Sequence, residues 1–600
     1  LRTLTIIKDA LDLINTKREK LNLDAIDLEE IDLEDRLTFD LLQNGLTTAV
    51  FQLESRGLKE YLVKIKPSSF EDIISVVALY RPGPLDAGMV DTFIKRKHGS
   101  EKTDYLGDKD IEKVLKNTYG VIVYQEQVMQ LAQEYSGFSL GQADLLRRAM
   151  GKKIPEEMER QRPEFIKGAL KKGKIERAAE GLFDQIQTFA GYGFNKAHSA
   201  GYGLIAFQTA WLKAHYPVEF LSAALSSDMD DSDRVRLLLD DCKNFEIDIL
   251  KPDVNKSELN FVNQGDNEIL YGLGAVKGLG KAAIENIISE REQKPFENLY
   301  DFCARVDLSK VDKRGIEPLI KCGAMDSFNL SRKEMLESLE DAMKYAKQNT
   351  MTQESGISDL FGGISESNDF IPVKKDKYDN FANSKFEFSA LGFYLETHPV
   401  KEHYWELKKL GTGSIENVME ERVNTISGVI IRQNRIQTRR GPLVFATLDD
   451  GTDRIELVIS SDVLDSFEGN LNPQTIYIAS GDVTFEKDTQ KKNIGLQKKM
   501  RVTDIKSLEE ARMKSVTKLK INIEGQEKKD VLDIVENLKA IALIENNTQG
   551  SQIEMQYNLN SGSANIELDK DFRILLNDDN MDKLVENCGK ENIDFQYRAR

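Results

Sequence analysis

Cysteine is scarce in this 600-residue sequence, and its placement excludes the chemistry that paired cysteines usually bring. The 4 cysteines lie far apart, with no CxxC pair and no histidine at zinc-ligand spacing. They are Cys242, Cys303, Cys322 and Cys588. This distribution predicts reduced, buried thiols in a cytoplasmic protein instead of a zinc site or a disulfide framework.

Long apolar runs are also missing. No stretch approaches the roughly 18 uninterrupted apolar residues of a membrane-spanning helix, so the sequence excludes an integral membrane protein. No secretory signal opens the sequence. The first residue is Leu1 instead of Met, and an amphipathic pattern starts at once, so we expect a sequence that is truncated at its front.

Positive charge is in deficit, because 82 lysines and arginines face 100 aspartates and glutamates, a net charge of −18. This balance excludes a protein that simply coats nucleic acid through its overall charge. A local basic cluster can still bind phosphates, because the field near a polyanion depends on nearby charges. The positions of the basic residues therefore matter more than their number.

The length predicts about four domains, and we find no internal repeat. Changes in hydrophobic period divide the chain, and together they predict a multidomain α+β protein. We expect a mainly helical region over 1–250, shorter helices with a glycine-rich hairpin over 251–345, a polar linker over 346–366, a connecting region over 367–422, a small β-barrel over 423–505 and a separate α+β domain over 510–600.

The barrel is predicted from alternating apolar and polar residues that begin near residue 423. Turn signals at Arg440-Gly441-Pro442 and Asp450-Gly451 indicate consecutive hairpins. About five short strands in this stretch are typical of a small barrel such as the OB-fold.

The strongest basic cluster is "DLLRRAMGKKIPEEMERQR". A helix is expected to end near Gly151 and another to start at Pro155, so basic side chains gather around the junction. These are Arg147, Arg148, Lys152 and Lys153. Such a fork suits a polyanion such as a triphosphate, which arginine binds in bidentate fashion. The alternative is an ordinary solvated charged face.

A glycine-rich turn, "FAGYGFNKAHS", comes before a long helix that should stop before Pro217. Lys196 and His198 lie at the mouth of this turn. The alternative is that His198 is a core histidine with a backbone partner and that the aromatic residues are simply core.

The segment "LYGLGAVKGLGKAAIENIISER" is typical of a helix-hairpin-helix. Gly278 and Gly280 would let the backbone approach a DNA phosphate, and the helix that begins at Lys281 would point its first amides at it. A plain helical turn is the alternative.

One barrel hairpin carries Arg432, Arg435, Arg439 and Arg440. OB-folds bind single strands along such a face, with positive charge on the backbone and aromatic rings under the bases. Aromatic residues are few here, so phosphate contact is better supported than base stacking.

Taken in order, these segments closely resemble the bacterial C-family replicative DNA polymerases, the DNA polymerase III α subunits. The matching runs are "TTAVFQLESRGLKEYL", "VALYRPGPLDAGMVD", "YGVIVYQEQVMQLAQ", "ADLLRRAMGKKIPEEM", "GYGFNKAHSAGYGLIAFQTAWLKAHYPVEF" and "YGLGAVKGLG". With the barrel, the resemblance covers essentially the whole chain.

The resemblance implies the C-terminal half of such a polymerase, starting just after the third of three palm aspartates that hold two Mg²⁺ ions. Residues 1–250 would then be the end of the palm and the fingers, with no catalytic carboxylate of their own. The basic fork, Lys196 and His198 would bind the incoming dNTP, and His198 would help to exclude ribonucleotides.

The resemblance also implies partners: primer-template DNA, dNTPs, a sliding clamp, the tau subunit of the clamp loader at residues 510–600, and a separate proofreading exonuclease. "GISDLFGG" resembles the clamp-binding peptide of the family through Asp359, Leu360 and Phe361, although Ile357 replaces the usual glutamine.

Two other functions stay open. One is a non-catalytic DNA-binding scaffold that combines the hairpin unit and the barrel. The other is an error-prone paralogue of the same family.

Overall fold

The computed structural model describes residues 2–152, 155–189, 192–328, 330–355, 380–396, 398–420, 422–439, 441–467, 471–487, 496–524, 534–536, 538, 550–559, 562–568 and 573–598. They form two compact units, the first from most of residues 1–376 and the second from most of residues 377–600. Each unit has hydrophobic cores of its own.

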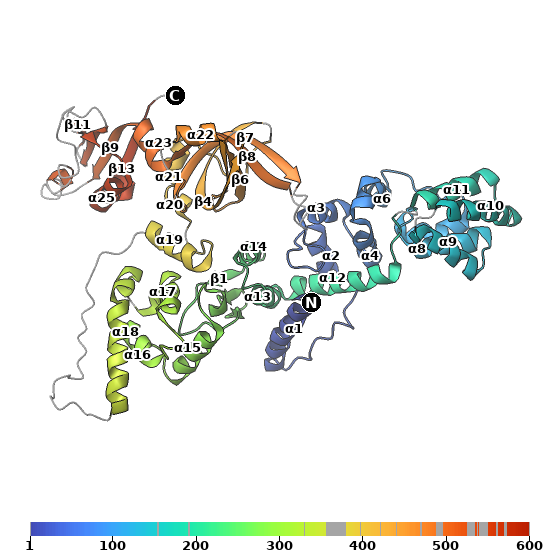
Figure 1. Ribbon diagram of the computed structural model, residues 1–600, viewed down its shortest axis with the longest axis horizontal. Coiled ribbons are helices and arrows are strands. Elements are labelled where there is room, and N and C mark those ends of the chain that lie inside the picture. Colours follow the sequence, from blue (N-terminus) through green and yellow to red (C-terminus); the bar gives the residue numbers. More distant parts are fainter. Residues whose placement is uncertain are drawn as a thin grey trace. The chain divides into compact units, whose positions relative to one another are not determined.

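The first unit starts with helices that pack around α12, the 20-residue helix Lys196–His215 (Figure 1). Ala206, Phe207 and Ala210 on its buried face join a core with residues of the neighbouring helices. α12 ends just before Pro217, as the sequence predicts. The other helices of this part are α1 (Arg2–Lys20), α2 (Arg36–Gln43), α3 (Arg56–Ile65), α4 (Phe70–Leu79), α5 (Pro82–Asp86) and α6 (Met89–Lys97).

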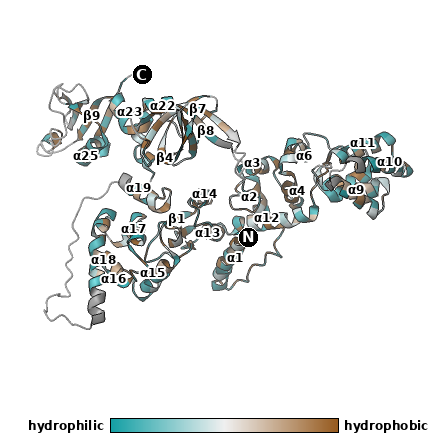
Figure 2. Cartoon of the chain, viewed as in Figure 1, coloured by the Kyte–Doolittle hydropathy of each residue, from teal (hydrophilic) through white to brown (hydrophobic). Residues whose placement is uncertain are grey.

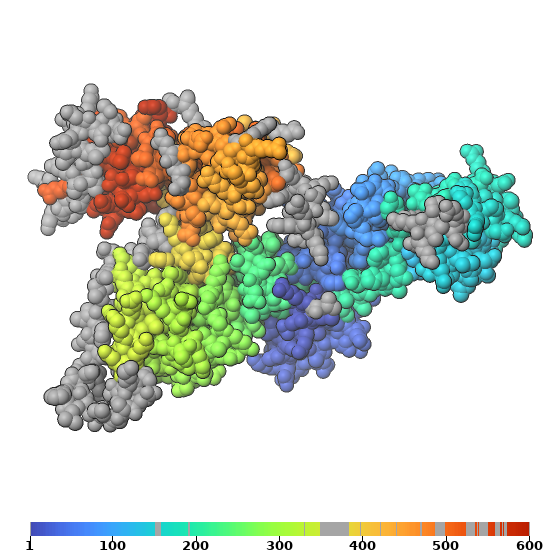
Figure 3. All heavy atoms as spheres, viewed as in Figure 1, coloured from blue at the N-terminus to red at the C-terminus, as the bar shows by residue number. Residues whose placement is uncertain are grey.

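A second helical lobe has a separate core and is seen as a body of its own in Figures 1 and 3. At its centre lies Phe165, whose ring centroid is 6.2 Å or less from those of Tyr135, Phe138 and Phe183. Hydrophilic residues predominate on α10 and α11 in Figure 2. The lobe consists of α7 (Lys109–Leu115), η1 (Lys116–Thr118), α8 (Gln125–Ser136), α9 (Leu140–Lys152), α10 (Pro155–Lys171) and α11 (Glu176–Phe189).

After α13 (Pro217–Ser227) and α14 (Ser232–Lys243) the chain forms a small sheet in the order β1-β3-β2. Its strands are β1 (Asp248–Leu250), β2 (Val262–Asn263) and β3 (Glu268–Leu270), and η2 (Leu273–Ala275) follows them. The remaining helices of this unit are α15 (Lys281–Gln293), α16 (Leu299–Arg305), α17 (Lys313–Lys321), η3 (Asp326–Phe328) and α18 (Arg332–Ser355). α18 thus continues into the stretch 346–366 that we expected to be a linker, because lysine, glutamine and methionine there are good helix formers.

The second unit contains a closed five-stranded barrel in the order β4-β5-β6-β8-β7. All neighbouring strands are antiparallel except β6 and β8, which are parallel. Both predicted hairpins, β4-β5 and β5-β6, are present. The elements are β4 (Val423–Thr438), β5 (Gly441–Asp449), β6 (Arg454–Ile459), α22 (Ser461–Ser466), β7 (Ile476–Lys487) and β8 (Leu496–Ser507).

A C-terminal sheet of the order β11-β10-β9-β13, with β12 beside β10, packs on α25. The buried Arg512 ties this part to the helices before the barrel, because its guanidinium donates to Glu406 at 2.7 Å and to Asp578 at 3.0 Å. The elements are α19 (Asn380–Leu391), α20 (Pro399–Glu402), α21 (Tyr404–Lys409), α23 (Leu508–Ser515), β9 (Val516–Glu524), β10 (Ser551–Leu559), β11 (Gly562–Glu567), β12 (Arg573–Ile574), α25 (Asp578–Cys588), η4 (Lys590–Asn592) and β13 (Ile593–Tyr597). The predicted class, a multidomain α+β protein with helical fingers and a β-barrel, is confirmed.

Candidate functional site

The Arg81-Pro82-Gly83-Pro84 turn packs against the glycine-rich turn before α12. A Cβ atom on Gly83 would lie 2.4 Å from the Tyr192 ring, so only glycine allows this close approach. Arg81 donates from Nη2 to the Tyr192 carbonyl at 2.9 Å, and its guanidinium lies 4.4 Å from the Phe194 ring centroid. The two turns, which are distant in the sequence, are therefore packed tightly against each other.

A carboxylate from α8 fixes the start of α12. Glu126 accepts from Asn195 Nδ2 at 2.7 Å and from the Lys196 backbone N–H at 2.9 Å. Asn195 in turn caps the helix by accepting from the His198 backbone N–H at 2.8 Å. The Lys196 ammonium lies 3.1 Å from Glu71 and 5.5 Å from the Tyr124 ring centroid, so its charge already has a carboxylate partner.

The arginine fork on α9 is organised around a single carboxylate. Arg147 Nη2 lies 2.8 Å from Asp144 Oδ1, and Arg148 Nε lies 2.7 Å from Asp144 Oδ2. The hydrogen bond from Arg147 and the charges of both arginines hold the pKa of Asp144 below its usual range. Two guanidinium groups on one carboxylate leave an excess positive charge at the end of α9.

Gln125 brings the arginine fork and the glycine-rich turn together. Its Oε1 lies 3.5 Å from Arg147 Nη1, a long contact, while its Nε2 donates to the Gly193 carbonyl at 3.2 Å. Its backbone N–H donates to the Phe194 carbonyl at 2.9 Å. The two clusters that the sequence suggests separately therefore meet at one residue.

Lys153 and Gly191, and the side chain of Lys152, lie outside the described residues.

His198 starts a row of rings on the exposed side of α12. Its ring centroid lies 5.6 Å from that of Phe194 and 4.4 Å from that of Tyr202, and Tyr202 lies 5.3 Å from Phe51. The His198 side chain is exposed, and it is its backbone N–H that holds the turn. The row offers flat ring faces and begins next to Phe194, whose carbonyl accepts from the backbone of Gln125.

The predicted helix-hairpin-helix turn lies between η2 and α15. Gly278 has a φ of +83°, a backbone conformation that favours glycine. Gly280 caps α15 and is exposed, and a Cβ atom there would meet no atom within 4 Å. The described chain itself gives no steric reason for glycine at 280, which fits the approach of an external backbone. Lys281 lies 3.7 Å from Glu285.

On the barrel, Arg432, Arg435 and Arg439 all lie in an exposed run at the end of the β4-β5 hairpin. Arg440 lies outside the described residues, as do Asp359, Leu360 and Phe361 of the clamp-binding-like peptide, with Ile357.

Comparison with known proteins agrees with this arrangement. Residues 3–173 match the family model of the bacterial DNA polymerase III alpha subunit finger domain, residues 246–335 a helix-hairpin-helix motif, and residues 425–508 an OB-fold nucleic acid binding domain. The chain is 39% identical over its whole length to the DNA polymerase III subunit alpha of Pasteurella multocida, of which it covers 52%. It is 42% identical over 89% of its length to that of Escherichia coli K12, of which it covers 46%.

The chain belongs to the bacterial DNA polymerase III α-subunit family. It spans about half the length of the curated relatives it matches. Within the described residues, no helix is long and apolar enough to cross a membrane, and no three or more His, Cys, Asp or Glu side chains gather as a metal site would require.

Sequence patterns alone missed three residues of this candidate site. Glu71 and Glu126 look like ordinary solvated charges, and Gln125 looks like an ordinary helix residue. The run "YGVIVYQEQVMQLAQ" lies within the stretches that resemble the polymerase III family, and it was the one available signal that Gln125 and Glu126 matter.

Proposed function

We propose that this chain forms the nucleotide-binding and DNA-binding half of a replicative DNA polymerase. The single observation that supports this most is that Gln125 contacts both the arginine fork, through Arg147, and the glycine-rich turn, through Gly193 and Phe194. The Phe194 ring in turn lies 5.6 Å from the His198 ring. Excess positive charge next to flat apolar faces matches a nucleoside triphosphate, which carries a polyanion on one end and an aromatic base on the other.

In the proposed reaction, the 3′-hydroxyl oxygen of a primer attacks the α-phosphorus of a dNTP. The new P–O bond forms as the bond to the β-phosphate oxygen breaks, the hydroxyl loses its proton, and pyrophosphate leaves. Two Mg²⁺ ions would stabilise the attacking and leaving oxygens. We assign those ions to carboxylates of the full-length protein outside this chain.

The residues of this chain would bind and orient the substrate. Arg147 and Arg148 would hold the triphosphate, together with Lys152 and Lys153. Lys196 would have to exchange Glu71 for a phosphate, because the ammonium and that carboxylate are already in contact. His198 would lie beside the sugar.

DNA would be bound through the other two sites. The backbone at Gly278, Gly280 and Lys281 would contact duplex phosphates, since exposed amides at a helix start bind anions. The barrel arginines would contact the single-stranded template. We further propose that residues 359–361 bind the sliding clamp, that residues 510–600 bind the tau subunit, and that a separate exonuclease proofreads.

Replacing Arg147 with Ala in the full-length protein tests the triphosphate site. We expect the KM for dNTP to rise about tenfold or more, because a hydrogen bond to a charged group contributes about 1.5–3 kcal/mol. The Kd for primed DNA should stay the same. Arg160→Ala, which removes an exposed arginine of α10, is the matched control and should change neither quantity. A fall in DNA affinity at unchanged dNTP kinetics would place Arg147 on the duplex instead.

A further inference from the structure

The loop between α2 and α3, residues 46–54, carries unusual backbone strain. Ala49 and Gln52 both have a φ of +61°, although neither is glycine. Such residues are uncommon and persist only where their surroundings hold them in place. Gln52 is exposed, and its side-chain amide makes no hydrogen bond within the described part of the chain. The loop thus holds a strained residue whose polar group points to solvent.

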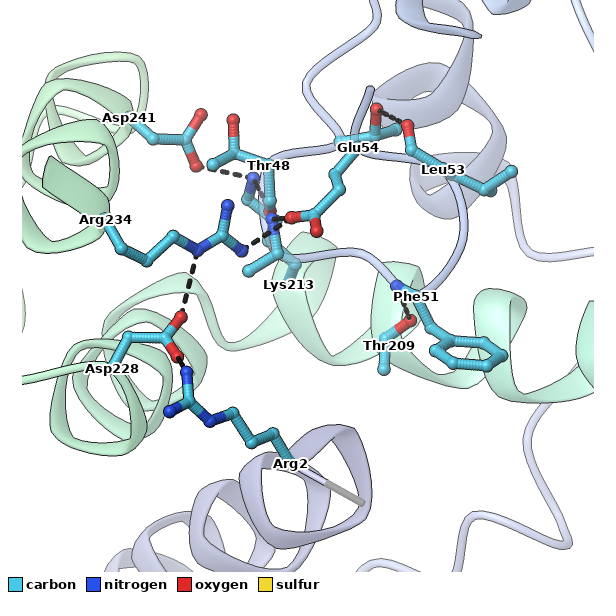
Figure 4. Close-up of polar contacts among 12 residues, drawn as sticks. Arg2, Thr48, Phe51, Leu53, Glu54, Thr209, Lys213, Asp228, Arg234 and Asp241 are labelled. Atoms are coloured by element: carbon cyan, nitrogen blue, oxygen red, sulfur yellow. Dashed lines mark hydrogen bonds and ion pairs between the residues drawn. The ribbon is translucent and has the colours of Figure 1, made fainter. Parts of the chain in front are cut away.

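A buried lysine holds the first half of the 46–54 loop (Figure 4). Lys213 of α12 is fully buried and donates from Nζ to the carbonyls of Leu46 and Thr48, both at 2.8 Å. Its ammonium lies 2.5 Å from Asp241 Oδ2. Burial lowers the pKa of Lys213 to about 8, against the opposing effect of Asp241. The C-terminal part of α12 is therefore fastened to the loop.

A carboxylate closes the second half of the loop. Glu54 Oε2 accepts from the Ala49 backbone N–H at 3.1 Å and from Arg234 Nη2 at 2.6 Å. Arg234 continues to Asp228 at 2.9 Å, and Asp228 also accepts from Arg2 at 2.9 Å, as Figure 4 shows. These contacts oppose any relaxation of the strained residues.

The 46–54 loop extends the ring row of α12. The Phe51 backbone N–H donates to Thr209 Oγ1 at 3.1 Å, and the Phe51 ring is the last of the row that runs from His198 through Tyr202. Gln52 is the next residue along the chain. The exposed amide therefore follows the Phe51 end of the row, whereas the His198 end lies next to Phe194, which Gln125 links to Arg147.

We propose that Phe51 and Gln52 contact the template base opposite the incoming nucleotide. This inference rests on the proposed function. With the triphosphate at the fork and the sugar at His198, the new base pair would extend along the row toward Phe51. Aromatic faces stack on any base. The Gln52 amide has both a donor and an acceptor, so it can bond to any of the four template bases.

Lys213, Glu54 and Arg234 are positioning residues in this proposal. They reach no ligand, and they act by keeping Phe51 and Gln52 in place. The proposal thus gives the buried Lys213 ammonium a task, which is to hold the loop that presents the exposed Gln52.

Gln52→Gly in the full-length protein tests the contact, because glycine adopts a positive φ without strain and so preserves the loop. Single-nucleotide incorporation is measured opposite a normal template base and opposite an abasic site. We expect kcat/KM opposite a base to fall about tenfold, the size of one lost hydrogen bond. Incorporation opposite the abasic site should not change, because the contact is absent there in both proteins.

Asn22→Gly is the matched control, since Asn22 is also exposed and has a φ of +56°. It should change neither rate. Equal losses on both templates, or no loss on either, would overturn the role of Gln52. An absence of templated incorporation by the unsubstituted protein is a different result, and it would overturn the proposed function itself.

Thr209 offers a test of positioning without touching the ligand. Thr209→Val removes the acceptor of the Phe51 N–H at nearly constant volume, whereas Thr209→Ser keeps it. For the valine variant alone, we expect kcat/KM to fall opposite a template base. Opposite an abasic site, kcat/KM should stay the same for both variants. A loss shared by both templates would make the contact merely structural.

Discussion

At the scale of single residues, the ring of His198 is restrained although it is exposed. Its ring contacts the rings of both Phe194 and Tyr202, and the start of its helix is fixed by Asn195 and Glu126. A ring held in this way can exclude a ligand by collision. In the proposed site, a 2′-hydroxyl would meet the ring where a deoxyribose leaves room, so selectivity would come from a clash.

His198→Ala should therefore raise ribonucleotide incorporation while largely sparing deoxynucleotide use, with a discrimination ratio that falls about tenfold or more. The ratio of kcat/KM for dNTP over the matching rNTP on one template measures this. His98→Ala, at an exposed histidine after α6, serves as the control. An unchanged ratio with equal loss for both sugars would make His198 a structural residue.

At the scale of elements, α12 connects the proposed nucleotide site at its first turn with the 46–54 loop near its other end. Its first turn carries Lys196 and His198, while Thr209 and Lys213 near its other end hold the 46–54 loop. Between these ends, Gly203 lets α12 pack closely against the backbone of Ile74 on α4. A shift of the helix would move both ends of the ring row together.

The β4-β5 hairpin of the barrel is a second element, and we expect it to bind the single-stranded template. Replacing Arg432 and Arg435 with Gln in the full-length protein should weaken its binding to single-stranded DNA. The salt dependence of that binding constant should fall as well. Two lost phosphate contacts reduce the slope of log K against log salt by about 1.4. Titration of a single-stranded template at several salt concentrations measures the slope. Lys514→Gln, an exposed lysine of α23, is the control, and an identical slope for the arginine variant would return both arginines to the solvated surface.

Elements were easier to predict from the sequence than the site. The end of α12 before Pro217, the start of α10 at Pro155 and the β4-β5-β6 hairpins follow from local periodicity and turn residues, which act over a few positions. Gln125 joins groups that are distant in the sequence, and no local pattern encodes such a contact. The strain at Gln52 was equally hidden, since no local pattern in the sequence marks a glutamine that adopts a positive φ.

At the scale of the whole molecule, a net charge of −18 coexists with three local clusters that we propose as phosphate sites. Each site uses a different device: paired arginines, exposed backbone amides, and arginines on a hairpin. Local placement therefore decides what the chain binds, as the charge deficit already suggested. The chemistry of bond formation is assigned to carboxylates outside the chain.

Primer extension by two proteins tests whether this chain binds substrates without forming the new bond itself. The full-length protein and the 600-residue chain alone are given the same primed DNA, dNTPs and Mg²⁺. We expect both to bind the DNA and only the full-length protein to extend the primer, because we assign the metal-holding carboxylates to the part of that protein outside this chain. Robust extension by the 600 residues alone would contradict it.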